Sequence, residues 1–179
     1  MNEVQRVPAP QGKVWAALND PVILKGCIPG CQSLEMTSPT DMTAAVVVKV
    51  GPVKANFTGK VTLSDLDPPN GYRISGEGSG GVAGFAKGGA MVTLQADGED
   101  ATNLHYVVDA QIGGKLAQLG ARLIDSTAKK IAGEFFQNFA NALAPPAPEV
   151  PETQEAAEAQ AADAPAGEEK KGWLKRLIS

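Results

Sequence analysis

The chain has 179 residues and carries 16 Lys and Arg against 20 Asp and Glu, which gives a small net negative charge. No broad basic surface is visible in the first 144 residues, where 12 basic side chains face 13 acidic ones, and this argues against nucleic acid as a partner. Nothing at the start resembles a signal peptide, and no stretch approaches the roughly 20 apolar residues that cross a bilayer. We therefore expect one domain of ordinary size in the cytoplasm.

The first part of the chain is predicted to form a short strand and two short helices. Residues 3–7 form the strand, and residues 8–18 form a helix with its apolar side chains on one side. Asn19-Asp20-Pro21 ends this helix, and a proline at the first helical position then begins a second one over residues 22–25. Residues 34–37 begin a series of strands.

Two cysteines, Cys27 and Cys31, surround a predicted turn at Pro29-Gly30. A structural zinc site needs four ligands, and His105 is the only further soft ligand in the sequence. A disulfide is disfavoured in a reducing compartment. We therefore expect two small buried side chains at a turn and no metal site.

The middle of the chain is predicted to be an antiparallel meander of about six strands. The clearest signal lies in residues 53–66, where apolar and polar side chains alternate, and a period of two indicates a half-buried strand. Similar alternation occurs in residues 42–50, 72–77, 90–96 and 104–112, with short turns between them. Successive strands joined by short turns favour antiparallel pairing.

A long helix is predicted from Lys115 to Leu143, between Gly113-Gly114 and Pro145, with a length of about 43 Å. Its large apolar residues follow one another mainly in steps of four: Leu119, Leu123, Ile131, Phe135, Phe139 and Leu143. Such a row winds slowly around the helix and suits contact with a twisted sheet. The predicted fold class is therefore α+β, with a curved antiparallel sheet of six to seven strands around a long C-terminal helix.

Many positions on the inward face of the predicted sheet carry small residues, namely Ala55, Gly59, Gly76, Gly78, Gly88, Ala90 and Ala110. Small residues opposite a long helix leave unfilled volume unless larger side chains elsewhere close the gap. We expect a ligand cavity there, with the two tyrosine hydroxyls as polar groups for binding. The predicted lining is Phe57, Tyr72, Ile74, Val92, Tyr106, Val108, Leu119 and Leu123.

The segment 76–89 is rich in glycine and contains a formal Gly-x-Gly-x-x-Gly at Gly76, Gly78 and Gly81. A dinucleotide site needs a helix directly after this motif, whereas here more glycines and a strand follow. We predict a flexible hairpin with Phe85 near its tip, which either gates the mouth of the cavity or bends the sheet. Phe85 is therefore included among the cavity residues.

The composition changes after residue 144. Residues 145–169 are Ala, Pro and Glu with almost no large apolar side chain, so a disordered linker is predicted. Residues 170–179 combine basic and apolar side chains on a short amphipathic segment, which favours an anionic membrane surface. A peptide that docks in a groove of a partner protein and a frayed terminus are the alternatives. The predicted membrane-binding residues are Lys170, Lys171, Trp173, Leu174, Lys175, Arg176, Leu177 and Ile178.

Residues 1 to about 143 resemble the CoxG family, whose members are described as a subunit of carbon monoxide dehydrogenase, and which lies within the START-like, helix-grip (SRPBCC) superfamily. The resemblance is carried by Val14–Pro21, Cys27–Cys31, Val50–Val53 and Gly84–Ala86. It implies a helix-grip domain with a ligand cavity over residues 1–144. It also implies association with a molybdenum-containing CO dehydrogenase, or a related hydroxylase, at the inner membrane, and it supplies no catalytic residues.

The function expected from these observations is a non-enzymatic accessory protein on the inner face of the cell membrane. It would hold an apolar ligand such as a quinone or another prenyl lipid, without a covalent cofactor, and bring it to the partner oxidoreductase. A ligand-free assembly factor or tether is the alternative. An enzyme of the cyclase or hydrolase type is disfavoured, because His105 has the outward parity of its strand and the interior offers little beyond Tyr72 and Tyr106.

Overall fold

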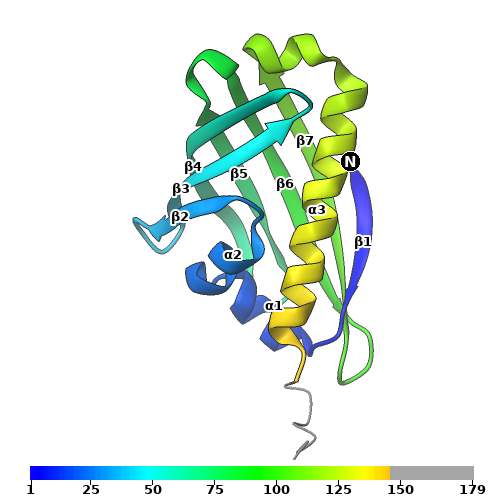
Figure 1. The fold of residues 1–179 in the computed structure, drawn as a ribbon. Coiled ribbons are helices and arrows are strands. Elements are labelled where there is room, and N and C mark those ends of the chain that lie inside the picture. Colours follow the sequence, from blue (N-terminus) through cyan, green and yellow to red (C-terminus); the bar gives the residue numbers. More distant parts are fainter. Residues whose placement is uncertain (146–179) are drawn as a thin grey trace, which may run out of the picture. The chain divides into compact units, whose positions relative to one another are not determined.

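A seven-stranded antiparallel sheet curves around one long helix in the computed structural model, which describes residues 1–145 (Figure 1). The order of strands across the sheet is β1-β7-β6-β5-β4-β3-β2, so only β1 is displaced from its place in the sequence. This architecture confirms the predicted α+β class. The strands are β1 (Asn2–Val7), β2 (Cys31–Met36), β3 (Asp41–Val50), β4 (Val53–Asp67), β5 (Gly71–Ser79), β6 (Phe85–Ala96) and β7 (Thr102–Gly113).

The helices occupy the concave side and one end of this sheet. Two short helices, α1 (Gln11–Leu18) and α2 (Pro21–Cys27), lie at one end, and α3 (Ala121–Leu143) runs across the concave face (Figure 1). Asp20 caps α2, because its carboxylate accepts a hydrogen bond of 2.8 Å from the backbone N–H of Val22. The opposite end carries two short 3₁₀ helices, η1 (Gly81–Ala83) and η2 (Gly114–Leu119).

The long helix begins later than predicted, at Ala121 instead of Lys115. Residues 114–119 form the 3₁₀ helix η2, and Gly120 separates it from α3 with a φ of 90° and a ψ of 148°. These angles lie outside the helical region, and a positive φ favours glycine. Gly120 is therefore a boundary between two helices and not a tolerated glycine inside one.

Small residues form most of two rows across the strands on the concave face. Each row joins directly paired positions of four neighbouring strands, so the sheet presents mainly backbone to α3 along both rows. The first row is Ala44, Gly59, Gly78 and Ala86, and the second is Val61, Gly76, Gly88 and Ala110. We call these two rows the glycine floor.

The hydrophobic core is divided between the two ends of the domain. The larger cluster joins α1, α2 and the end of α3 to the sheet, and Phe139 and Leu104 are fully buried in it. A smaller cluster around Val50, Ala83 and Leu116 closes the other end. Between the clusters, the side chains of α3 that face the sheet remain only half-buried, which indicates unfilled volume.

The segment Cys27–Cys31 forms the predicted turn between α2 and β2. Gly30 adopts a φ of 74°, and a side chain at this position would collide with the carbonyl oxygen of Val47 on β3. Cys27 is buried and Cys31 is half-buried, and both thiols are free. Burial raises the pKa of both thiols. Close packing against β3 therefore explains why glycine occupies position 30.

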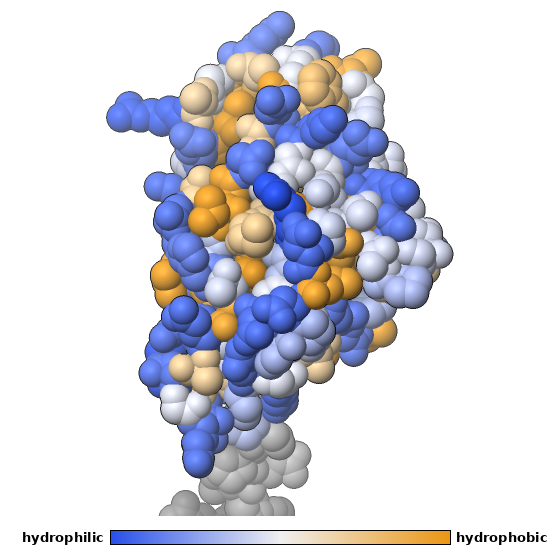
Figure 2. Space-filling view, turned by 180° about the vertical axis from the view of Figure 1, so that it is seen from behind, coloured by the Kyte–Doolittle hydropathy of each residue, from blue (hydrophilic) through white to orange (hydrophobic). Residues whose placement is uncertain are grey.

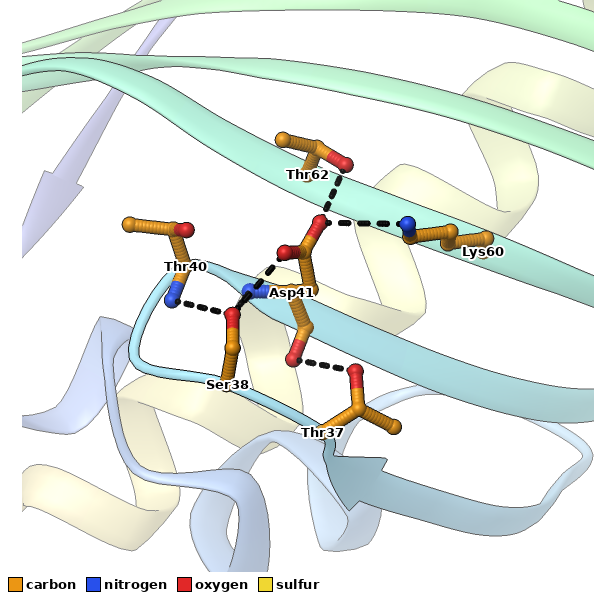
Figure 3. Close-up of polar contacts among 6 residues, drawn as sticks. All are labelled: Thr37, Ser38, Thr40, Asp41, Lys60 and Thr62. Atoms are coloured by element: carbon orange, nitrogen blue, oxygen red, sulfur yellow. Dashed lines mark hydrogen bonds and ion pairs between the residues drawn. The ribbon is translucent and has the colours of Figure 1, made fainter.

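A polar network fixes the turn between β2 and β3 to β4 (Figure 3). Asp41 accepts hydrogen bonds of 2.7 Å from the hydroxyl of Thr62 and 2.8 Å from that of Ser38. The ammonium group of Lys60 lies 3.6 Å from the same carboxylate. These hydrogen bonds, with that of Thr62 the largest influence, hold the pKa of Asp41 below its ordinary value.

The face opposite to α3 is mixed in character, with hydrophilic side chains between smaller hydrophobic areas (Figure 2). Val4, Met91 and Val107 are exposed, and Met91 and Val107 are direct partners on β6 and β7. Within residues 1–145, no helix combines the length and apolarity needed to cross a membrane.

Candidate ligand-binding cavity

A cavity of about 370 Å³ lies between the sheet and the second half of α3, where it also borders α1 and α2. Its wall is almost entirely apolar, and side chains of α1, α2, β2 to β7 and α3 contribute to it. The lining consists of Leu18, Leu24, Ile28, Leu34, Met42, Ala44, Val46, Val61, Leu63, Tyr72, Ile74, Ala90, Val92, Leu104, Tyr106, Phe135 and Phe136. Enclosed apolar volumes of this size with few polar groups are typical of sites for small lipophilic molecules.

Tyr106 is one of two polar side chains in this wall. Its hydroxyl donates a hydrogen bond of 2.8 Å to the carboxylate of Glu3, and its ring stacks on Phe136 with centroids 5.1 Å apart. Burial, and secondarily the negative carboxylate of Glu3, raises the pKa of Tyr106 to about 12. The hydroxyl is therefore neutral at physiological pH, and its proton is directed towards Glu3.

Tyr72 is the second polar side chain in the wall, and it is buried. Its ring meets Trp15 of α1 edge to face, with centroids 5.5 Å apart. Burial alone raises the pKa of Tyr72 far above its ordinary value, with no contribution from a charged or hydrogen-bonding partner. Of the two tyrosines, Tyr72 is thus the better placed to offer its hydroxyl to a ligand.

The cavity continues over the glycine floor. An adjoining open groove of about 400 Å³ shares Ala44, Val46, Val61, Ile74 and Ala90 with the cavity and is lined by Gly59, Gly76, Gly78 and Gly88. A third pocket of about 180 Å³ lies under the first half of α3 and shares Phe57 and Ala86 with the groove. The unfilled volume therefore extends along the concave face from the end near α1 and α2 to the end near η2.

The predicted lining residues fall into three groups. Tyr72, Ile74, Val92 and Tyr106 line the main cavity, and Val108 and Phe57 line the adjoining groove. Leu119 and Leu123 instead pack with the small cluster around Val50 and Leu116, because η2 turns the chain away before α3 begins. Phe85 is also outside the cavity: it is about half exposed and lies beside a shallow depression with Lys87 and Glu77. Binding of a ligand by any of these residues remains a prediction.

Sequence reasoning missed most of the helical part of the wall. Phe135 and Phe136 contribute from α3, and Leu18, Leu24 and Ile28 contribute from the segment that includes α1 and α2. The adjacent pair Phe135-Phe136 was an available signal, because two consecutive aromatic residues on a helix broaden its apolar face towards the sheet. The contribution of α1 and α2 depends on how they close the end of the sheet, which no periodicity reveals.

Other predicted features lie away from the cavity. His105 is on the outer face of β7, where its Nε2 lies 2.6 Å from the Oδ1 of Asn2. Among residues 1–145, no group of three or more His, Cys, Asp or Glu side chains is arranged to hold a metal ion. The predicted linker 145–169 lies outside the described residues except for Pro145, and the predicted membrane-binding residues 170–179 lie entirely outside them.

The fold is shared with several solved structures. A conserved protein from Geobacillus kaustophilus has 30% sequence identity and a TM-score of 0.75, over 79% of this chain and 93% of that one. A START superfamily protein from Mycobacterium smegmatis has 11% identity and a TM-score of 0.63, over 80% and 95%. The ZhuI aromatase/cyclase from Streptomyces sp. R1128 has 12% identity and a TM-score of 0.61, over 80% and 92%. The domain is thus a START-like, helix-grip domain.

The family is defined by a sequence model. Residues 4–144 match the model of CoxG, which is described as a subunit of carbon monoxide dehydrogenase, so the chain belongs to the CoxG family. A comparison with curated proteins gives no match. The predicted family and fold are confirmed.

Proposed function

We propose that this protein is a non-enzymatic accessory protein that holds a lipophilic molecule, such as a quinone or another prenyl lipid, for a molybdenum-containing CO dehydrogenase-type oxidoreductase. The observation that carries the proposal is the elongated apolar volume between the sheet and α3. A flat, lipophilic ring suits the aromatic part of the cavity at Phe135, Phe136 and Tyr106, and an extended chain suits the groove over the glycine floor.

The proposed partner follows from the family. Its description names a subunit of carbon monoxide dehydrogenase, and an oxidoreductase of this kind must pass its electrons to an acceptor. A protein that holds a lipophilic acceptor in a closed apolar site could bring it from the membrane to the enzyme. The proposed location is the inner face of the membrane, with Trp173, Leu174 and Leu177 of the tail as lipid contacts.

The chemistry of the wall supports a binding role over catalysis. General acid–base catalysis needs groups that exchange protons near neutral pH, whereas the pKa values of Tyr72 and Tyr106 are both raised well above that range. The single histidine of the sequence, His105, lies on the outer face of the sheet. The likeness to an aromatase/cyclase at 12% identity concerns the fold alone.

Lipid extraction of the purified full-length protein, followed by mass spectrometry, tests the proposal. We expect a prenyl lipid in a defined ratio to protein. A matched pair of variants makes the test specific: Gly76→Leu fills the groove, because a Cβ at Gly76 meets only ordinary contacts and points into it. Ser75→Leu adds the same side chain on the outer face of the same strand.

Gly76→Leu should lower the bound lipid at least tenfold, and Ser75→Leu should leave it unchanged. If neither the parent protein nor Ser75→Leu yields any bound lipid, and added quinone does not bind, the carrier proposal is wrong. Retention of activity towards the partner in such a protein would then favour the alternative, a ligand-free assembly factor or tether. Variants of Trp173 and Leu177 should release the protein from membranes and leave its bound lipid in place.

A further inference from the structure

The end of the domain that carries η1 and η2 exposes apolar side chains. Val82 is 86% exposed and Phe85 is 52% exposed, both in the turn between β5 and β6. Scattered exposed apolar residues are common on protein surfaces. These two, however, are three residues apart on one protruding turn, so they form a small hydrophobic tip (Figure 1).

The structure holds this tip firmly in place. The backbone N–H of Gly80 donates to the carbonyl of Gly84 at 2.8 Å, which closes the turn. Ala83 is buried in the small cluster with Val50 and Leu116, directly beside the exposed Val82. The turn thus inserts one side chain into the domain and directs its neighbour outward.

Four exposed cations surround the same end. Lys49 and Lys54 are direct partners on β3 and β4, next to the turn over residues 50–53. Lys115 precedes the buried Leu116, and Arg122 precedes a leucine that packs against the same cluster. The acidic residue nearest to Arg122 in the sequence is Asp125, on the first turn of α3. Residues 1–144 are almost neutral as a whole, so this concentration gives one end a positive charge.

The tip also lies over the end of the hollow interior. The pocket of about 180 Å³ under the first half of α3 is lined by Val50 and Leu116, the same residues that pack against Ala83. Only the shell formed by η1, η2 and the β3–β4 turn separates this pocket from the exposed tip. Movement of that shell would connect the interior with whatever surface the tip contacts.

We propose that this end of the domain, with Val82 and Phe85 at its centre and Lys49, Lys54, Lys115 and Arg122 around them, docks on an anionic lipid bilayer. The surface differs from the predicted tail contact, because it belongs to the folded domain. Two apolar side chains are too few for a stable protein interface, which buries about 800 Å² on each partner. A small apolar insertion with flexible cations around it is what the headgroup region of an anionic bilayer accommodates.

Co-sedimentation of the full chain with vesicles of phosphatidylcholine containing phosphatidylglycerol tests the proposal. The background carries Trp173→Ser and Leu177→Ser, so that the tail contributes little. In this background, Val82→Asp should lower binding at least tenfold. Lys54→Glu and Lys115→Glu should each lower binding at least fivefold, the factor that corresponds to about 1 kcal/mol per charge near an anionic surface.

The matched controls lie at the opposite end of the domain, on α2. Val22 is 78% exposed and Lys25 is also exposed, so Val22→Asp and Lys25→Glu make the same chemical changes away from the tip. Both should bind vesicles as the background protein does. Equal losses at the two ends, or equal binding to vesicles of phosphatidylcholine alone, would overturn the proposal. Loss of co-purification with the oxidoreductase in Val82→Asp, with vesicle binding unchanged, would assign the tip to a protein partner instead.

Discussion

The two tyrosines at the cavity give the domain an internal reporter. Tyr72 and Tyr106 are the only tyrosines of the chain, and both line the same apolar volume. Their pKa values are raised for the same main reason, burial, although Tyr106 also faces the carboxylate of Glu3. Any signal from tyrosine ionisation therefore comes from the wall of the cavity.

An alkaline titration followed by tyrosinate absorbance should show no ionisation in the native protein near pH 10, the ordinary pKa of tyrosine. Because the folded-state pKa values lie above those of the unfolded chain, the stability that this provides is complete below about pH 10 and is lost as the pH rises through about 12 for Tyr106. Glu3→Gln should move the Tyr106 transition to lower pH. Normal ionisation of both tyrosines near pH 10 in folded protein would contradict the enclosed cavity.

Asp41 should make the opposite contribution at the acid end. Its pKa is lowered in the folded state, so its contribution to stability is present above about pH 4 and disappears as the pH falls through the folded value. Asp41→Asn should therefore destabilise the protein at pH 7, with the deficit shrinking towards pH 3, as measured by urea unfolding at both pH values. The control is Asp125→Asn on the exposed face of α3, and a deficit independent of pH would contradict this role.

At the scale of elements, α3 has two different functions along its length. Its last turns pack closely, with Phe139 and Leu143 buried against the main cluster. Further towards its beginning, α3 crosses the glycine floor, where its inward side chains are only half-buried. The helix is therefore fixed at its ends and spans a hollow in between.

Two phenylalanine substitutions on α3 should differ for this reason. Phe139→Ala removes a fully buried ring and should cost about 3–5 kcal/mol in the free energy of unfolding. Phe136→Ala removes a ring that already borders the cavity, so its cost should be less than half as large. Urea unfolding of the two variants makes the comparison, and equal losses would indicate that the interior near Phe136 is filled.

The strands were predictable from the sequence because each follows a period of two. The register places the small inward residues opposite one another, so Gly76 and Gly88 become direct partners, as their shared parity suggested. The start of α3 was not predictable from periodicity, because the apolar spacing continues through η2 and only the backbone angles of Gly120 end it. The same error placed Leu119 and Leu123 at the cavity and left out Phe136.

For the molecule as a whole, the hollow interior predicts a strong dependence of stability on the ligand. A molecule that binds only the folded state at 100 times its Kd adds about 2.7 kcal/mol. For a domain of this size, this corresponds to a rise in Tm of roughly 5–10 °C. Removal of bound lipid should lower the Tm by this amount, and added quinone should restore it. In Gly76→Leu the response to added quinone should be absent.

The glycine floor has a consequence for solvent. Its peptide groups are bonded laterally to their neighbours, but no side chains shield them on the concave side. Water in an empty groove can therefore reach the amides of β5 and β6 from within as well as from outside. Deuterium uptake along Gly76 and Gly88 should thus be fast in the emptied protein and slow once a guest covers them, which makes these amides a direct measure of occupancy.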